Sequence, residues 1–245
     1  MTFPKIEAPP YLTTEQMREV DRAMIEDYGI DLIQMMENAG RALAHLARIR
    51  FLDGDPSGKR VVVLAGTGGN GGGALVSARR LHSVGVRVQV VTTKESNAFT
   101  SVPRRQLDIL RRMGLPIYVG AVTKDAGAPD LIIDGLIGYS LHGAPRGAAA
   151  DLIAWANAQP APILALDTPS GLDTTTGVVR EPAIRATATM TLALPKEGLR
   201  APGAASTVGE LYLADISVPP GLYARPPLNL DAGPLFAESD IVRLH

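Results

Sequence analysis

Residues 61–81, VVVLAGTGGNGGGALVSARRL, run from branched aliphatic side chains through a cluster of glycines into a helical pattern. Within this stretch, residues 66–71 (GTGGNG) fit the pattern G-x-G-x-x-G. A glycine loop between a strand and a helix presents free backbone N–H groups and the positive end of a helix dipole to an anion. The stretch therefore predicts a strand–loop–helix unit with a binding site for the phosphates of a ligand.

The same succession of strands and helices extends along the chain. Apolar runs predict strands at residues 60–66, 87–93, 115–120, 130–138, 162–171, 187–196 and 209–218, and helical spacing predicts helices at 11–30, 30–49, 74–85, 102–114 and 151–159. The strands are apolar throughout instead of alternating, which is typical of a parallel sheet covered on both faces. We therefore predict an α/β fold: a doubly wound three-layer α/β/α sandwich with a mostly parallel, Rossmann-like sheet, built as one domain from residues 1–245.

The composition limits the classes of function. Of the 245 residues, 46% are hydrophobic and 20% are charged, which is enough apolar material for a sizeable core. The net charge is −1, so we expect no basic patch for nucleic acid. The absence of cysteine excludes disulfides, thiolate zinc sites and cysteine nucleophiles. No apolar run approaches the roughly 20 residues of a membrane span and the start lacks a targeting signal, so we expect a cytoplasmic protein without a membrane partner.

Polar side chains follow four of the predicted strands. They are Asn70, Asp134, the pair Asp167 and Ser170, and Lys196. Right-handed crossovers bring the loops after parallel strands to one edge of the sheet, where ligands bind in such folds. We therefore expect these residues to lie around one ligand site.

A redox dinucleotide site is one interpretation of the glycine loop. Such a site also needs an acidic residue about 20 positions further on, at the end of the second strand, to hold the ribose. Here that strand ends in Thr92, Thr93 and Lys94, and Glu95 comes slightly late. Hydride transfer is therefore poorly supported, and a tight turn without a ligand is the other alternative.

Asp167 is the best candidate for chemistry. A carboxylate at the end of a buried strand is costly unless it is paired or hydrogen-bonded, so the position needs a reason. Capping of the following Asp-Thr-Pro-Ser-Gly turn is the structural alternative. Ser170 does not lie in G-x-S-x-G, so it is not expected to be a nucleophile of that type. Lys196 is either a strand-end lysine that reaches to solvent or a phosphate contact.

Other residue types support weaker interpretations. Methionines Met17, Met24, Met35 and Met36 are interpreted as core or subunit interface. The four histidines, His45, His82, His142 and His245, share no metal-ligand spacing, although His142 lies in the glycine-containing loop 135–147 and is placed to touch a ligand.

Six segments, in chain order, match motifs of one family. Residues 12–17 with Asp21 fit L-T-x-x-Q-M-x-x-x-D, residues 36–40 are M-E-N-A-G, residues 66–74 fit G-x-G-N-N-G-G-D-G in part, and residues 133–138, 167–171 and 194–198 are similar to V-D-A-x-F-G-x-G, D-I-P-S-G and L-P-K-x-G. From about residue 11 to residue 219 the chain thus resembles the NAD(P)H-hydrate epimerases, the YjeF N-terminal domain family. The glycine loop would then hold a dinucleotide as substrate and not as redox partner.

The resemblance implies a reaction and a site. The reaction interconverts the R and S forms of hydrated NADH and NADPH, with Asp167 as general acid and base and a potassium ion held by Asn70, Asp134 and Ser170. The implied substrate-binding residues are Gly68, Gly69, Asn70, Gly71, Gly72, Gly73, Gly138, Tyr139, Ser140, Leu141, His142, Gly143, Ala144, Asp167 and Lys196. We also expect a homodimer, no nucleic-acid partner, and a separate dehydratase that acts on the same substrate.

The chain departs from the family pattern in the glycine loop. The first Asn of the motif is Gly69, its Asp is Gly73 and the following Gly is Ala74. Loss of an Asp at a helix N-terminus removes about 1 kcal/mol of helix stability. The alternative function is therefore a non-catalytic nucleotide-binding or scaffold domain of the same fold. In either case we expect no dehydratase domain within these residues.

Overall fold

The computed structural model describes residues 3–6, 9–123 and 127–244. The helices are α1 (Thr14–Glu26), α2 (Leu32–Phe51), α3 (Gly69–His82), α4 (Ser101–Arg112), α5 (Ala148–Asn157), α6 (Ala205–Val208) and α7 (Pro220–Tyr223), with 3-10 turns η1 (Ser96–Ala98), η3 (Glu197–Arg200) and η4 (Pro202–Ala204). The strands are β1 (Arg60–Ala65), β2 (Arg87–Thr92), β3 (Ile117–Val119), β4 (Leu131–Gly135), β5 (Ile163–Leu166), β6 (Ala188–Leu192), β7 (Glu210–Ala214) and β8 (Ile241–Arg243).

Within these residues the strands form one sheet in the order β3-β2-β1-β4-β5-β6-β7-β8. Every neighbouring pair from β3 to β7 is parallel, and β8 alone runs antiparallel, beside β7. The prediction of a doubly wound, mostly parallel α/β fold is confirmed. The last strand, β8, was not among the predicted strands.

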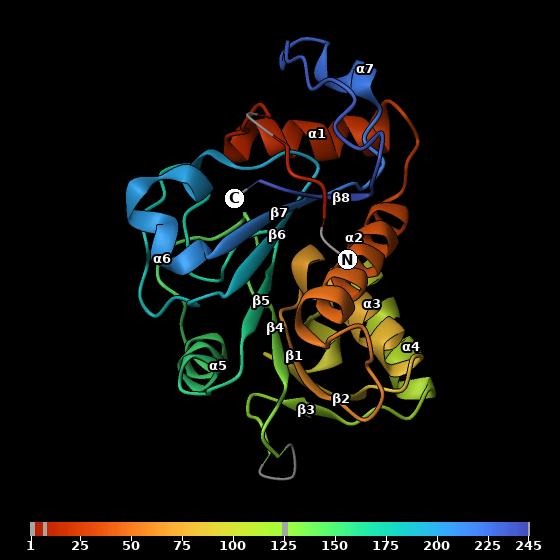
Figure 1. Ribbon diagram of the computed structural model, residues 1–245, viewed down its shortest axis with the longest axis vertical. Coiled ribbons are helices and arrows are strands. Elements are labelled where there is room, and N and C mark those ends of the chain that lie inside the picture. The colour runs from red at the N-terminus through yellow and green to blue at the C-terminus, as the bar shows by residue number, and fades with distance from the viewer. Residues whose placement is uncertain (1–2, 7–8, 124–126, 245) are drawn as a thin grey trace.

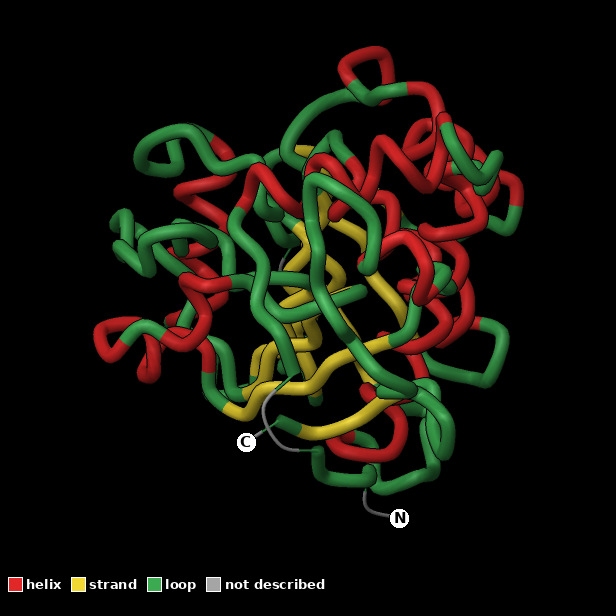
Figure 2. The backbone as a smooth tube through the Cα atoms, turned by 90° about the horizontal axis from the view of Figure 1, so that it is seen from above, coloured by secondary structure: helices red, strands yellow, loops and turns green. Residues whose placement is uncertain are grey.

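Helices cover both faces of the sheet (Figure 1). Helices α2, α3 and α4 pack on one face, where their apolar side chains join those of alternate strand residues in the largest buried cluster. Helix α5 lies on the other face and shares a second cluster with the remaining strand residues. Seen from above, the strands lie between helices on either side (Figure 2). No helix of the described chain combines the length and apolar character that a membrane span requires.

The strand order reverses at β1. Strands β2 and β3 lie on one side of β1 and β4 lies on the other, so the loops that leave β1 and β4 diverge and open a crevice. The two loops begin side by side, because the Gly66 N–H donates to the Gly135 carbonyl at 3.0 Å. A Cβ atom on Gly66 would lie 1.9 Å from the Leu136 carbonyl oxygen, so only glycine allows this approach.

The N-terminal arm brings α1 to the carboxyl edge of the sheet. Thr13 is the N-cap of α1 and forms a capping box with Gln16. Just before it, the buried Leu12 donates to the Pro195 carbonyl at 2.8 Å and accepts from the Glu197 N–H at 2.9 Å. The arm is therefore fastened to the loop after β6, and α1 is held above the strand ends (Figure 1).

Candidate functional site

A cleft of about 530 Å³ lies at the point where the strand order reverses. Its walls are one face of α1, one face of α2, the glycine loop after β1 and the loop after β4, and the ends of β5 and β6 form its floor. Of the residues predicted to bind substrate, Gly68, Gly69, Asn70, Gly71, Gly73, Gly138, Tyr139, Ser140 and Asp167 line this cleft. The predicted loops and the predicted carboxylate therefore share one cavity.

The remaining predicted residues lie elsewhere. Leu141, His142, Gly143 and Ala144 continue the loop after β4 but are absent from the cleft wall, and His142 is exposed. Gly72 is buried, and an added Cβ would lie 2.4 Å from the sulfur of Met36, which itself lines the cleft.

Asp167 and Lys196 form a buried ion pair at the floor of the cleft. The Lys196 Nζ atom donates to Asp167 Oδ1 at 2.5 Å, and the lysine side chain has no exposed area. Lys196 also donates to the Leu192 carbonyl at 2.9 Å and to the Thr191 hydroxyl at 3.2 Å. The ammonium group thus donates all three of its hydrogen atoms to groups inside the protein. Lys196 does not reach solvent, so that interpretation of it is wrong, and its contact with a phosphate stays a prediction.

The backbone at Asp167 is held in the left-handed region, with φ of +65°. The Thr168 N–H donates to the Leu166 carbonyl at 2.8 Å, which closes a three-residue turn on Asp167, and the Asp167 N–H donates to Met190 at 2.7 Å. Such a conformation costs a non-glycine residue about 1–3 kcal/mol and persists where the surroundings fix it. The side-chain bonds of Asp167 run to Lys196 and Thr191, so the capping alternative is not what the structure shows.

Asp134 and Ser170 lie together beneath the loop after β4. Asp134 is fully buried and accepts three hydrogen bonds, from the Ser170 hydroxyl at 2.7 Å, the Ser170 N–H at 2.8 Å and the Leu136 N–H at 3.1 Å. Burial raises the pKa of Asp134 to about 6, against these three bonds, which favour the ionised form. The Ser170 hydroxyl also accepts from the Ile137 N–H, which ties the ends of β4 and β5 to each other.

Asn70 reaches the same corner from the glycine loop. A Cβ added to Gly138 would lie 3.2 Å from the Asn70 Cβ and 3.6 Å from its Oδ1, so the amide packs against the loop after β4. The Asn70 Nδ2 atom is buried without a hydrogen-bond partner. Because this nitrogen is a donor, an acceptor atom of a ligand or a water would complete its bonding.

A second carboxyl group, for which we predicted no role from the sequence, lines the cleft. Asp21 projects from α1 and accepts a hydrogen bond from the Tyr139 hydroxyl of the loop after β4. Burial raises the pKa of Asp21, and the Tyr139 bond and the charge of Lys196 oppose that rise. The only sequence signal for Asp21 was its place in the opening motif.

The methionine-rich helices line the cleft as well as the core. Met17, Met24, Met35 and Met36 are all buried, as their interpretation as core requires. Three of them, Met17, Met35 and Met36, also line the cleft, with Ile25 and Leu32 nearer its rim. One side of the cleft is therefore an apolar wall, opposite the polar floor at Asp167.

Acidic and imidazole side chains do not gather as a metal cluster. Within the described ranges, no three His, Cys, Asp or Glu side chains are close enough to hold a metal ion together. Any ion at this site would therefore depend on one carboxylate with neutral oxygens, such as the hydroxyl of Ser170 and the amide of Asn70.

The chain is similar to known proteins over most of its length, including most of the residues of the cleft. The sequence model of the family described as "YjeF-related protein N-terminus" matches residues 32–198. A Dehalogenimonas lykanthroporepellens protein named NAD(P)H-hydrate epimerase is 42% identical over 226 residues, which are 92% of this chain and 89% of that protein. A Rhodopirellula baltica protein of the same name is 34% identical over 222 residues, or 89% of this chain and 88% of that protein.

Longer relatives also match. A Salinibacter ruber protein named bifunctional NAD(P)H-hydrate repair enzyme is 37% identical over 226 residues, and the match spans 86% of this chain but 41% of that protein. A crystal structure of a yeast protein shares the fold, with a TM-score of 0.78 at 23% identity, covering 96% of this chain and 100% of that chain. The chain belongs to the YjeF-related N-terminal family.

Proposed function

We propose that this chain is an isomerase that interconverts the R and S forms of hydrated NADH and NADPH. The observation that carries the proposal is the Asp167–Lys196 ion pair, placed at the floor of a cleft that has a glycine loop as one wall. The names of the single-domain relatives support the same activity, because they match most of the chain.

The cleft offers one region for each part of a dinucleotide. The glycine loop opens α3 with free N–H groups at the helix N-terminus, which suits the pyrophosphate. The apolar wall formed by Met17, Ile25 and Leu32 suits one face of the nicotinamide ring. With the phosphates at the loop, the ring would extend over the floor toward Asp167.

The proposed chemistry needs a proton to move in each direction. Loss of the hydroxyl from C6 of the ring leaves an iminium-like cation, and water then adds from either face. The Asp167 carboxyl protonates the departing hydroxyl and afterwards takes a proton from the entering water. A carboxylate beside the cation also stabilises it, and Lys196 and Thr191 hold that carboxylate in place.

We further propose a potassium ion held by Asn70, Asp134 and Ser170. Asn70 lies in the first turn of α3, Asp134 in β4 and Ser170 in the loop after β5, and all three offer oxygen atoms, which a hard cation prefers. One carboxylate with neutral oxygens suits a monovalent ion better than magnesium, which requires strict octahedral geometry. Asn70 would offer its Oδ1 to the ion, and its unpaired Nδ2, a hydrogen-bond donor, would remain for an acceptor such as a substrate oxygen. A bound ion would supply positive charge at this corner and hold the two loops together.

Turnover of a pure epimer tests the proposal. NADPH is hydrated chemically, one epimer is purified, and its conversion to the other is followed by chromatography with and without the protein. We expect the protein to accelerate the approach to the equilibrium mixture. Binding of the hydrate without acceleration would instead favour the non-catalytic alternative, to which the altered positions Gly69, Gly73 and Ala74 point.

A further inference from the structure

Asp21 and Tyr139 form a polar contact between two walls of the cleft, α1 and the loop after β4. Asp21 lies on the face of α1 that also carries Met17 and Ile25, at the i, i+4 and i+8 positions, and all three line the cleft. Tyr139 comes from the loop after β4, 118 residues away in the chain, and donates its hydroxyl proton to Asp21. The contact therefore joins α1 to a loop that the reaction is proposed to use.

The charges around Asp21 belong to the same site. Asp167 and Lys196, from the ends of β5 and β6, both act on the Asp21 carboxyl, and Asp21 acts in turn on the buried Tyr223 of α7. Burial raises the pKa of both Asp21 and Tyr139, whereas Asp167 is paired with an ammonium group. Two carboxyl groups of one cavity thus have opposite environments, as in sites that divide acid and base duties.

We infer that Asp21 is a second acid–base group of this site, acting on the ring face opposite to the one that Asp167 serves. The inference rests on the proposed epimerase function. Epimerisation requires the hydroxyl to leave one face of C6 and water to enter the other. With Asp21, each face has its own carboxyl group, so the two proton transfers assigned above to Asp167 alone are divided between two residues. Asp21 and Asp167 stand on different walls of the cleft, on α1 and on the sheet edge.

The proton balance is symmetric. The protonated Asp21 gives its proton to the C6 hydroxyl, the C–O bond breaks with its electron pair on oxygen, and water leaves a ring cation. A second water adds to the other face with its lone pair, and its proton passes to the Asp167 carboxylate. Asp21 ends ionised and Asp167 ends protonated, which is the starting form for the reverse reaction. One oxygen atom is exchanged with solvent in each inversion.

Oxygen-18 water separates the two roles. The variant Asp21→Asn is incubated with each pure epimer in H₂¹⁸O, and inversion and label uptake are measured separately against a protein-free blank. We expect inversion to fall about 10²- to 10⁴-fold, the usual contribution of a proton-transferring group. One epimer should still take up label without inverting, because Asp167 can release and return water on its own face.

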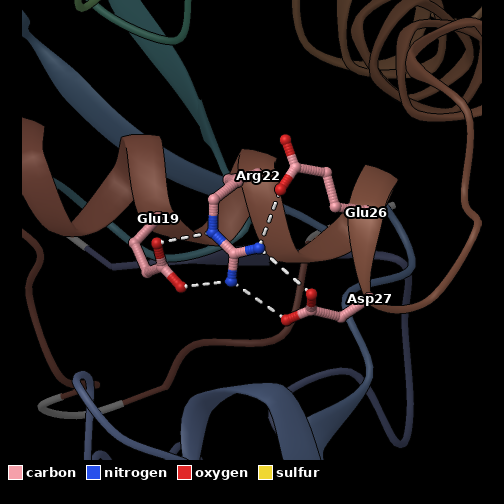
Figure 3. Close-up of polar contacts among 4 residues, drawn as sticks. All are labelled: Glu19, Arg22, Glu26 and Asp27. Atoms are coloured by element: carbon pink, nitrogen blue, oxygen red, sulfur yellow. Dashed lines mark hydrogen bonds and ion pairs between the residues drawn. The ribbon is translucent and has the colours of Figure 1, made fainter.

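Matched variants control for the fold. Glu19 lies about 200° around α1 from Asp21 and binds Arg22, in a network with Glu26 and Asp27 (Figure 3). Glu19→Gln makes the same carboxylate-to-amide change outside the cleft and should leave inversion unchanged. Tyr139→Phe removes the donor to Asp21, so it should shift the Asp21 limb of the kcat/KM profile to higher pH.

The outcomes are distinct. Inversion by Asp21→Asn at the wild-type rate would overturn the second role and leave the epimerase function standing. Loss of both inversion and label uptake from a folded variant would mean that Asp21 only shapes the cleft, and would also overturn it. If Asp21→Asn does not fold, the test rests on Tyr139→Phe. A pH profile of kcat/KM in Tyr139→Phe that matches the wild-type profile would then overturn the second role of Asp21. A wild-type chain without epimerase activity would overturn the function and this inference together.

Discussion

At the scale of single residues, the site depends on a buried pair of opposite charges. Asp167 and Lys196 are both removed from solvent, and each needs the other because an unpaired buried charge is costly. The left-handed backbone at Asp167 adds to this cost and directs the carboxylate into the cleft. Backbone strain of this kind occurs often at active sites, where a residue is held in an unfavourable conformation that its function requires.

Replacement of Asp167 by Asn tests the chemistry. The amide still accepts a hydrogen bond from Lys196 but cannot transfer a proton, so epimerisation should fall about 10²- to 10⁴-fold. Affinity for the hydrate should survive, because the phosphates are expected at the glycine loop. Rates come from the single-epimer assay and affinity from calorimetry. Near wild-type turnover in a folded Asp167→Asn chain would show that this carboxyl is not the acid or base.

Replacement of Lys196 by Met tests the ion pair. Removal of one partner of a buried pair leaves the other uncompensated, so the free energy of unfolding in urea should fall by about 3–5 kcal/mol. Adding Asp167→Asn to Lys196→Met should recover part of this loss without recovering activity. Lys59→Met is the control, because Lys59 makes only an exposed 3.8 Å pair with Asp53, worth at most about 1 kcal/mol. Equal effects at Lys59 and Lys196 would contradict the buried pair.

The proposed ion predicts a specific salt effect. The melting temperature of the wild-type chain should be higher in potassium chloride than in choline chloride at equal ionic strength. Asp134→Ala should lose this difference and should also be less stable, since Asp134 holds Ser170 and Leu136. A rubidium soak followed by anomalous diffraction locates the ion. Identical melting in both salts, with no anomalous peak near Asp134, would remove the ion from the account.

At the scale of elements, glycines set how closely the loops and helices approach. A Cβ on Gly40 of α2 would lie 2.4 Å from the Val76 Cβ of α3, so this glycine lets the two helices pack tightly. A Cβ on Gly71 would lie 1.9 Å from the Gly66 carbonyl oxygen, within the glycine loop itself. These contacts place the N-terminus of α3 directly above the strand end.

Two substitutions in the glycine loop should change the free energy of unfolding in opposite directions. Gly71→Ala places a methyl group against backbone, so it should destabilise the fold by about 1–3 kcal/mol. Gly69 is the first residue of α3 and has nothing within 4 Å of its Cβ position, so Gly69→Ala should be neutral or stabilising by up to about 1 kcal/mol. Urea unfolding of both variants measures the difference. A stable Gly71→Ala chain would mean that the loop is built differently.

Helices and strands could be predicted where the local sequence pattern determines their formation. The glycine run, the apolar strands and the helical spacing predicted a doubly wound, mostly parallel sheet, which the structure confirms. The three-residue β8 was missed, because a short segment among polar neighbours carries little pattern and is stabilised by β7. The pairings of Lys196 with Asp167 and of Tyr139 with Asp21 were not predictable, since they join residues 29 and 118 positions apart.

At the scale of the whole molecule, Glu210 links the sheet to a helix on its face. It begins β7 and accepts from Arg50 of α2 at 2.8 and 3.0 Å, and from the Tyr212 hydroxyl at 2.7 Å. The Arg50 guanidinium is the main reason that the pKa of Glu210 falls to about 2. The contact ties the far end of α2 to the edge of the sheet opposite the cleft.

The depressed pKa predicts an acid-sensitive contribution to stability. Glu210 is ionised in the folded chain down to about pH 2 and in the unfolded chain down to its ordinary value of 4.5, so its contribution is complete above about pH 5 and is lost as the pH falls toward 2. Because the pair is partly exposed, Glu210→Gln should cost only about 1 kcal/mol at pH 7. Its stability deficit relative to the wild-type chain should narrow between pH 5 and pH 3. A constant deficit would contradict the linkage.

The central claim is that the crevice where the strand order reverses holds a dinucleotide with its ring over Asp167. Diffraction from crystals soaked with NADP⁺ tests it most directly. We predict pyrophosphate density beside Gly68–Gly71 and the nicotinamide ring between Asp21 and Asp167, against the apolar wall of Met17 and Met35. Pyrophosphate density away from the glycine loop, or a ring outside the cleft, would contradict the account.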